Sequence, residues 1–295
     1  MVRPMRVVMA FFVWCSVAVP AWAVEEQCQA FGVNAQLPAL TNPRLERGTT
    51  LLCNLGYVAL VSTVSHGPLW AAEHLRANDL AAAADLPRKG HFYADPRWPG
   101  GAALSDYRRT KPYDRGHMAP SGDQPTLQAQ QETYALSNIV PQASVLNKGI
   151  WARMEHKVRL LAEREGELYV VTGPAFHLRP IATQGHDHVY VPSSVWKAVY
   201  SPSRGRAGVY VCKNRPVHPH CDQVSVQILI RNTGVDPFPA VPAQVKAQVW
   251  HLPSPECCVA PSLWGRAGRK VCNVQQAAPV AAFLLRSPHA AHSYG

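Results

Sequence analysis

The sequence has few charged residues, no internal repeat and no cysteines at zinc-knuckle spacing. Charged side chains make up 16% of its 295 residues. After residue 23, no stretch approaches the run of about 18 apolar residues that a transmembrane helix needs, so we expect no membrane partner for the remaining chain. None of the cysteines forms a C-x-x-C pair, which argues against a structural zinc site.

The first residues have the pattern of a secretory signal peptide. Arg3 and Arg6 precede the apolar run VVMAFFVWCSVAV, and the small-residue motif AWA follows at residues 21–23. We therefore expect cleavage after Ala23 and a secreted or periplasmic protein. An uncleaved membrane anchor is the alternative.

Seven cysteines follow this segment, and an oxidising compartment favours disulfide bonds between them. An odd number leaves one thiol free or paired between chains. The sequence predicts three pairs, namely Cys28 with Cys53, Cys212 with Cys221, and Cys272 with either Cys257 or Cys258.

Basic residues outnumber acidic ones. The chain has 29 Lys and Arg against 19 Asp and Glu, a formal charge of +10. Because Arg3 and Arg6 account for two of these charges, the chain after residue 23 carries about +8. Such a charge favours polyanionic partners, nucleic acid among them.

Helical and strand patterns are mixed without regular alternation, which indicates an α+β fold rather than a doubly wound parallel sheet. The lead-in at 24–50, the segment 88–101 and the tail at 277–295 show no regular pattern. Strands are predicted at 50–63, 167–176, 188–200 and 225–232, and helices at 68–84, 126–137 and 147–165.

The helix predicted at 147–165 places an amide and a carboxylate together. Asn147 and Glu155 are eight residues apart, about 80° beyond two full turns, so both side chains can face one groove. Their oxygen atoms suit a hydrated hard cation. The structural alternatives are a helix N-cap for Asn147, and for Glu155 a solvated helix face or an i,i+4 ion pair with Arg159.

The segment KPYDRGHMAPSGD, residues 111–123, concentrates several charged groups around a histidine. His117 has the near-neutral pKa that a general base needs, and the Arg115 guanidinium suits phosphate oxygens. Gly116 lets the backbone turn tightly or approach a ligand, and Asp114 can orient a neighbour by accepting a hydrogen bond. A polar turn with a surface ion pair is the alternative.

Four elements in this order resemble the DNA/RNA non-specific endonucleases, the ββα-metal nucleases that include endonuclease G. They are the DRGH of 114–117, Asn138 in SNIVPQ, Asn147 nine residues later, and Glu155 eight residues after that. The resemblance covers roughly residues 50–235. It implies a ββα-metal core with a mixed or antiparallel central sheet flanked by helices. We expect one nuclease domain at 24–276, including a cysteine-containing extension at 236–276.

The resemblance also implies roles for individual residues. His117 would be the general base, Asn147 the direct Mg²⁺ ligand, and Glu155 a residue that orients the water around the ion. Arg115 would stabilise charge on the phosphate, and Asn138 would support the site through hydrogen bonds. An upstream arginine is also implied; Arg88 is our choice, with Arg97 and Arg108 as rivals.

The implied activity is Mg²⁺-dependent hydrolysis of DNA and/or RNA, with Mn²⁺ as a substitute ion. Contacts to the phosphate backbone carry no sequence information directly, so low sequence specificity is expected. The protein would be a monomer or a homodimer.

Two other functions fit parts of the sequence. His186 and His188 in the segment GHDH could grip a metal ion in a different phosphodiesterase, although strand alternation would turn Asp187 away from both. A non-catalytic, secreted, basic nucleic-acid-binding protein would share the charge but not the activity.

Overall fold

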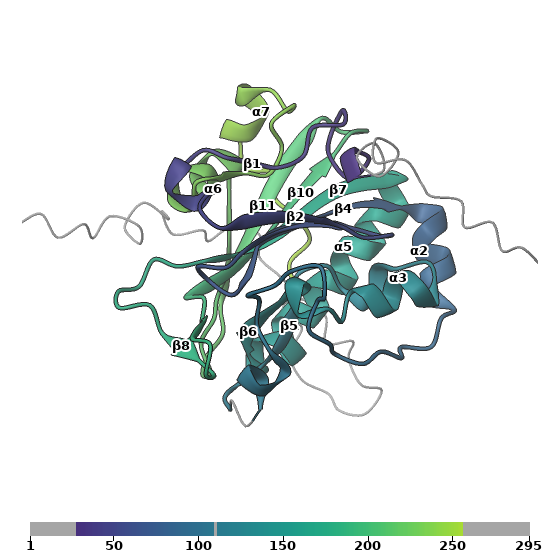
Figure 1. Cartoon of the computed structure of the whole chain (residues 1–295). Coiled ribbons are helices and arrows are strands. Elements are labelled where there is room, and N and C mark those ends of the chain that lie inside the picture. The colour runs from purple at the N-terminus through teal and green to yellow at the C-terminus, as the bar shows by residue number, and fades with distance from the viewer. Residues whose placement is uncertain (1–27, 109–110, 256–295) are drawn as a thin grey trace, which may run out of the picture. The chain divides into compact units, whose positions relative to one another are not determined.

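A seven-stranded sheet is the centre of the fold (Figure 1). The structure is a computed structural model that describes residues 28–108 and 111–255. All neighbouring strands of this sheet pair antiparallel. In spatial order they are β12 (Cys221–Val224), β11 (Arg206–Lys213), β10 (Ser194–Ser201), β7 (Glu167–Ala175), β4 (Gly67–Arg76), β3 (Val58–Ser62) and β2 (Thr49–Cys53).

One face of the sheet is covered by the helices that the candidate site uses (Figure 1). The sheet residues Ala71 and Val195 pack there against Met154 and Val158. The elements on this side are α2 (Ala77–Ala84), η3 (Ser121–Asp123), α3 (Leu127–Glu132), η4 (Leu136–Asn138), α4 (Ser144–Leu146), η5 (Asn147–Trp151) and α5 (Ala152–Glu165).

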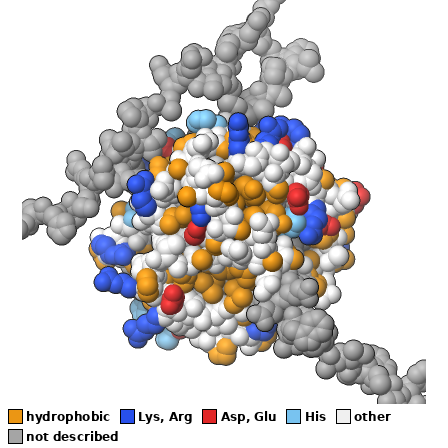
Figure 2. Space-filling view, turned by 90° about the horizontal axis from the view of Figure 1, so that it is seen from above, with side chains coloured by type: hydrophobic (Ala, Val, Ile, Leu, Met, Phe, Trp, Pro, Cys, Tyr) orange, Lys and Arg blue, Asp and Glu red, His pale blue; other side chains and the backbone are white. Residues whose placement is uncertain are grey.

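The opposite face carries a second apolar cluster, in which Trp70 and Trp196 pack with Leu229 and Phe238. Figure 2 views this side and shows Lys and Arg side chains around an area of hydrophobic ones. Its elements are β1 (Ala39–Leu40), η1 (Pro43–Leu45), α6 (Val226–Thr233), β13 (Val235–Asp236) and α7 (Ala243–Ala247).

Two short hairpins complete the described part of the fold, together with η2 (Leu104–Tyr107). One pairs β5 (Tyr113–His117) with β6 (Ile139–Ala143), and the other pairs β8 (Thr183–Gln184) with β9 (Val189–Tyr190). None of the helices within 28–108 and 111–255 is long and apolar enough to cross a membrane. The predicted α+β class, with helices flanking an antiparallel sheet, is confirmed.

Two of the predicted disulfide bonds are present. Cys28 bonds to Cys53 and fixes the start of the described chain to β2, and Cys212 bonds to Cys221 across β11 and β12. The third predicted pair lies outside the described residues, as do the expected signal peptide at 1–23 and the tail at 277–295.

Two predicted elements are wrong. The segment 225–232 is helix α6 rather than a strand, because the Ser225 side chain caps it by accepting from the backbone N–H of Ile228. The segment 68–84 begins as strand β4 and becomes helical only at Ala77. The small residues Ala71 and Ala72 lie buried in the sheet, where close packing outweighs their helix propensity.

The helix predicted at 147–165 is confirmed only from Ala152 onwards as a regular α-helix. Its predicted apolar side is buried, with Met154 at 0% and Leu161 at 2% exposure. The first turn, however, is π-helical, and Gly149 has non-helical dihedral angles. The angle expected between the side chains of Asn147 and Glu155 from a regular helix therefore does not apply.

Candidate active site

The DRGH segment forms strand β5 of the hairpin that carries the candidate site. Gly116 lies opposite Val140 in β6, and His117 lies opposite Ile139. A Cβ atom at Gly116 would lie 2.3 Å from Oε1 of Gln142 and 2.4 Å from its Cβ. The glycine therefore allows the close approach of the buried Gln142 side chain to β5.

His117 has an imidazole nitrogen without a partner. Its Nε2 atom is buried, and no described residue forms a hydrogen bond with it. Burial, and secondarily the nearby Arg115 charge, lowers the pKa of His117 to about 4. The ring contacts Tyr134 edge-to-face at 5.0 Å and Phe92 at 5.5 Å between centroids. The imidazole is thus neutral at physiological pH and held between two aromatic rings.

Arg115 is exposed, and its guanidinium carbon lies 4.2 Å from the centroid of the Phe92 ring. This cation–π contact orients the guanidinium beside the histidine. Arg115 and Phe92 also line an open groove of about 660 Å³, together with His91 and Arg108. A basic and aromatic groove therefore adjoins the His117 ring.

Asn138 is fully buried, and its amide bonds only to the backbone. Its Oδ1 accepts from the N–H of Ala119, and its Nδ2 donates to the carbonyl oxygens of Ala119 and Thr133. These bonds join the segment that follows β5 to the start of β6. The arrangement supports a positioning role, since the amide has no donor or acceptor directed at a substrate.

Asp114 connects the hairpin to the start of the helical segment. Its Oδ1 accepts from the Ser144 hydroxyl at 2.7 Å, and its Oδ2 accepts from Nδ2 of Asn147 at 3.3 Å and pairs with Lys148 at 2.9 Å. Burial by itself would raise the pKa of the Asp114 carboxyl. The hydrogen bonds from Lys148, Ser144 and Asn147 outweigh this effect, so the pKa lies below its usual value. Asn147 is thereby held against β5.

Glu155 lies in a group of charged side chains beneath the hairpin. Burial raises the pKa of this carboxyl to about 7; among its charged neighbours, Lys197 and Arg159 oppose the rise and Asp123 adds to it. Arg159 does not form the i,i+4 pair with Glu155 that was the structural alternative. Its Nη1 instead donates to Oδ1 of Asp123 at 2.7 Å.

Arg88 is exposed, but its guanidinium approaches the same group. A Cβ atom at Gly122 would lie 2.6 Å from Nη2 of Arg88 and 3.5 Å from Nη1 of Arg159, so the glycine leaves room for both arginines. Of the two rivals, Arg108 lines the groove beside Arg115. Arg97 is engaged elsewhere, because Asp95 and two other oxygens accept from its guanidinium.

Sequence reasoning missed the buried part of this charged group. Lys197 is 1% exposed and donates to the Thr172 hydroxyl at 2.6 Å. Glu73 is fully buried and accepts from Gln124, and burial, followed by the neighbouring Asp123, raises its pKa well above the usual value. Neither residue belongs to a motif. Lys197 lies on β10 and Glu73 on β4, and most of the neighbouring residues in both strands are apolar.

The residues present fit a single hydrated cation better than a fully protein-ligated metal. The Nδ2 of Asn147 faces Asp114, while no described residue donates to its Oδ1, so that oxygen can bind an ion. Within 28–108 and 111–255, no group of three or more His, Cys, Asp or Glu is placed to share a metal. Mg²⁺, which retains several water ligands, suits such a sparse set.

The rival GHDH segment is a turn between β8 and β9, not a strand. The His186 side chain is 95% exposed and pairs only with the adjacent Asp187. This exposed pair offers no third ligand from the described residues, so the structure gives no support to a metal site here.

Residues 38–244 match the DNA/RNA non-specific endonuclease family. The chain belongs to this family. It is 36% identical over 200 residues to the mitochondrial nuclease EXOG of Danio rerio, covering 60% of this chain and 57% of the relative. It is 32% identical over 168 residues to nuclease C1 of Cunninghamella echinulata var. echinulata, covering 50% and 65%.

A solved structure supports the same fold. The chain is similar to a protein in the crystal structure of the EndoG/EndoGI complex, with a TM-score of 0.59 and 26% identity, over 74% of this chain and 92% of the other. The expected ββα-metal nuclease fold and the family resemblance are confirmed. The chain spans less than two thirds of the length of the curated relatives named above.

The expected secreted or periplasmic location is wrong. Several relatives, including EXOG of Mus musculus and of Homo sapiens and a nuclease of Saccharomyces cerevisiae, are named as mitochondrial. These names contradict the expected export. The apolar beginning of the chain therefore does not establish export by itself.

Proposed function

We propose that this chain is a Mg²⁺-dependent endonuclease that hydrolyses phosphodiester bonds of DNA and/or RNA, with His117 as the general base. The observation that carries the proposal is the buried, unpartnered Nε2 of His117 next to Arg115, on the hairpin of a non-specific endonuclease fold. With the ring proton on Nδ1, the lone pair of Nε2 meets no protein donor and is available to accept a proton from water.

The low pKa of His117 keeps its ring neutral and ready to accept a proton. A phosphodiester bound beside the ring would add negative charge, which raises this pKa and strengthens the base. Tyr134 and Phe92 hold the ring in position from two directions, so that Nε2 keeps one orientation toward the attacking water.

Arg115 and Arg88 supply positive charge for the phosphate. The guanidinium of Arg115 is exposed and oriented by Phe92, and a planar fork of donors can bind two phosphate oxygens at once. The guanidinium of Arg88 lies near Gly122, where Arg159 also approaches. Arg115 and Arg88 would both stabilise the charge that develops as the bond to the leaving oxygen lengthens.

The side-chain oxygen Oδ1 of Asn147 and the carboxylate of Glu155 would hold the cation. When bound, Mg²⁺ neutralises negative charge on the phosphate and on the leaving oxygen. A divalent ion favours the ionised form of Glu155, whose pKa is raised to about 7, chiefly by burial. Asp114 keeps Asn147 turned so that its amide nitrogen points away from the ion.

The nuclease assay compares two histidine variants. Supercoiled plasmid and single-stranded RNA are incubated with the full chain in Mg²⁺ or in EDTA. We expect cleavage only with Mg²⁺, loss of cleavage in His117→Ala and normal cleavage in the matched exposed variant His186→Ala. Binding without cleavage by the wild type would instead identify a non-catalytic binder. Loss of activity in His186→Ala alone would move the site to the GHDH turn.

A further inference from the structure

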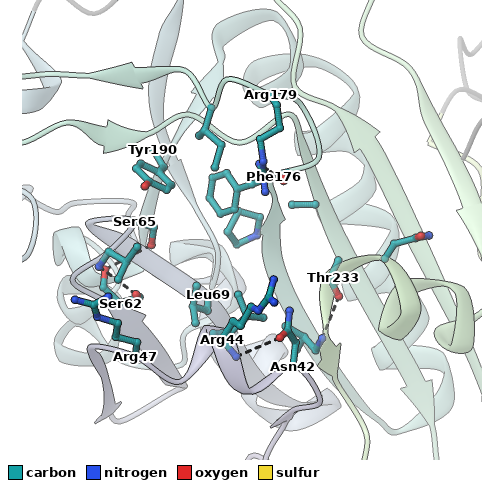
Figure 3. Close-up of a pocket in the computed structure, with 17 residues that line it drawn as sticks. Asn42, Arg44, Arg47, Ser62, Ser65, Leu69, Phe176, Arg179, Tyr190 and Thr233 are labelled. Carbon is teal, nitrogen blue, oxygen red and sulfur yellow. Dashed lines mark hydrogen bonds between the residues drawn. The ribbon is translucent and has the colours of Figure 1, made fainter. Parts of the chain in front are cut away.

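A second basic pocket lies away from the candidate active site (Figure 3). It has a volume of about 270 Å³ and is formed by η1, the turn after β3, the segment after β7 and the end of α6. Its apolar residues Leu69 and Val235 belong to the cluster on the α6 side of the sheet, whereas β5 and α5 pack on the other side. None of the proposed catalytic residues lines it.

Three arginines supply the charge of this pocket. Arg44 and Arg47 lie on one side, and Arg179 lies on the other (Figure 3). In the described part of the chain, no Asp or Glu lines the pocket and none forms an ion pair with these three arginines. Arg179 is held in place by donating Nη1 to the carbonyl oxygens of Phe176 and Leu178. Uncompensated guanidinium groups around a small cavity favour an anion, and their planar forks match phosphate.

Two aromatic rings lie in the same pocket. Phe176 and Tyr190 pack edge-to-face with their centroids 5.8 Å apart (Figure 3). Both are only partly buried, so the rings remain accessible to a ligand. A lone phosphate would use the arginines but not the rings, whereas a nucleoside phosphate would use both, with its base stacked on an aromatic face.

We propose that this pocket binds a nucleoside phosphate, either as a free mononucleotide or as the phosphorylated nucleotide at the end of a strand. The volume is close to the lower end of the range for small-molecule sites, about 300 Å³, which limits the ligand to one nucleotide. The site is separate from the cleavage chemistry and does not depend on the cation.

Binding is measured on the full chain carrying His117→Ala, in EDTA, so that no cleavage intervenes. The probes are dAMP, deoxyadenosine, inorganic phosphate and one short oligonucleotide with and without a 5′-phosphate. We expect dAMP to bind more tightly than deoxyadenosine or inorganic phosphate, each by about tenfold or more. Preference for the phosphorylated over the unphosphorylated oligonucleotide would identify a strand end, and binding of dAMP alone would identify a free nucleotide; either supports the proposal.

Variants locate the binding. Arg44→Ala with Arg179→Ala is expected to weaken dAMP binding about tenfold or more, and Arg231→Ala, an exposed arginine on α6 outside the pocket, to leave it unchanged. Photo-cross-linking of 5-bromo-dUMP, read by mass spectrometry, should mark Phe176 or Tyr190. Equal affinity in the double variant, equal affinity for inorganic phosphate, or cross-links only around Phe92 would overturn the proposal. None of these results depends on cleavage, so the outcome is independent of the nuclease assay.

Discussion

The guanidinium of Arg115 lies over the ring of Phe92, and the centroid of the same ring lies 5.5 Å from that of the His117 imidazole. One side chain from an irregular segment thus contacts both functional residues of β5. Phe92 is the residue that couples the orientation of the arginine to that of the histidine.

Replacing Phe92 should therefore reduce cleavage without unfolding the chain. We expect Phe92→Leu to lower kcat by about two- to fivefold, because a cation–π contact at an exposed site contributes about 0.5–1 kcal/mol. The measurement is steady-state cleavage of a short oligonucleotide. Tyr200→Leu, which removes a different partly buried ring, serves as control and should leave kcat unchanged. An unaltered kcat in Phe92→Leu would show that the contact has no role.

The His117 ring should titrate well below an ordinary histidine. Its pKa is lowered to about 4 by burial and by Arg115, so an NMR titration of the free protein should show a midpoint near that value. In Arg115→Gln the midpoint should move upward but stay below about 6.5, because burial remains. The unfolded chain takes up the proton near pH 6.5, so this histidine makes the fold lose stability as pH falls from about 6.5 to about 4. A midpoint near 6.5 in the wild type would contradict the buried environment.

Glu73 makes the stability of the fold depend on pH in the opposite direction. Its raised pKa means that the folded protein keeps a proton that the unfolded chain releases near pH 4.5, so stability falls as pH rises above that value. In Glu73→Gln this loss is removed. Relative to wild type, the variant should therefore become progressively more stable as pH rises above about 4.5.

Urea unfolding in EDTA at several pH values measures this gain. The control is Glu163→Gln, which makes the same substitution at an exposed glutamate on α5. A difference between Glu73→Gln and wild type that does not change with pH would mean that Glu73 is ionised in the folded state.

Asn138 should contribute mainly to the stability of the fold and only indirectly to cleavage. Asn138→Ala leaves an N–H and two carbonyl groups of buried backbone without their partners, which should lower the free energy of unfolding by about 2–4 kcal/mol. Thermal and urea unfolding measure the loss. Asn78→Ala, an exposed asparagine on α2, should change stability by less than about 0.5 kcal/mol. A stable Asn138→Ala protein without activity would instead assign Asn138 a direct catalytic role.

The elements that the sequence predicted correctly are those with a strong local signal. The extended segment at 50–63 follows from its β-branched and apolar residues, and the apolar side of α5 follows from helical periodicity. The strand predicted at 225–232 is wrong because its apolar residues suit a strand as well as a helix. The N-cap formed by Ser225 favours the helix. The helix predicted at 68–84 is a strand in its first half. The prediction failed because an alanine-rich segment gives no local sign that it will be buried between two layers.

The same limit applies to the candidate site. His117, Arg115 and Asn147 were found because they belong to a spaced motif. Lys197 and Glu73 were missed because burial of a charged residue depends on tertiary packing, which leaves no local pattern. Arg159 was placed on the right helix, but its partner Asp123 lies 36 residues away in sequence and could not be inferred from i,i+4 spacing.

The central claim is that the imidazole of His117 and the amide of Asn147 flank one divalent cation. Paramagnetic Mn²⁺ tests it directly, since it broadens NMR signals only from nearby nuclei. With labelled histidine side chains, substoichiometric Mn²⁺ should broaden the His117 signals and spare those of His186. In Asn147→Ala the same Mn²⁺ should leave His117 sharp. A His117 signal that stays sharp in the wild type, or broadens equally in Asn147→Ala, would contradict a shared metal site.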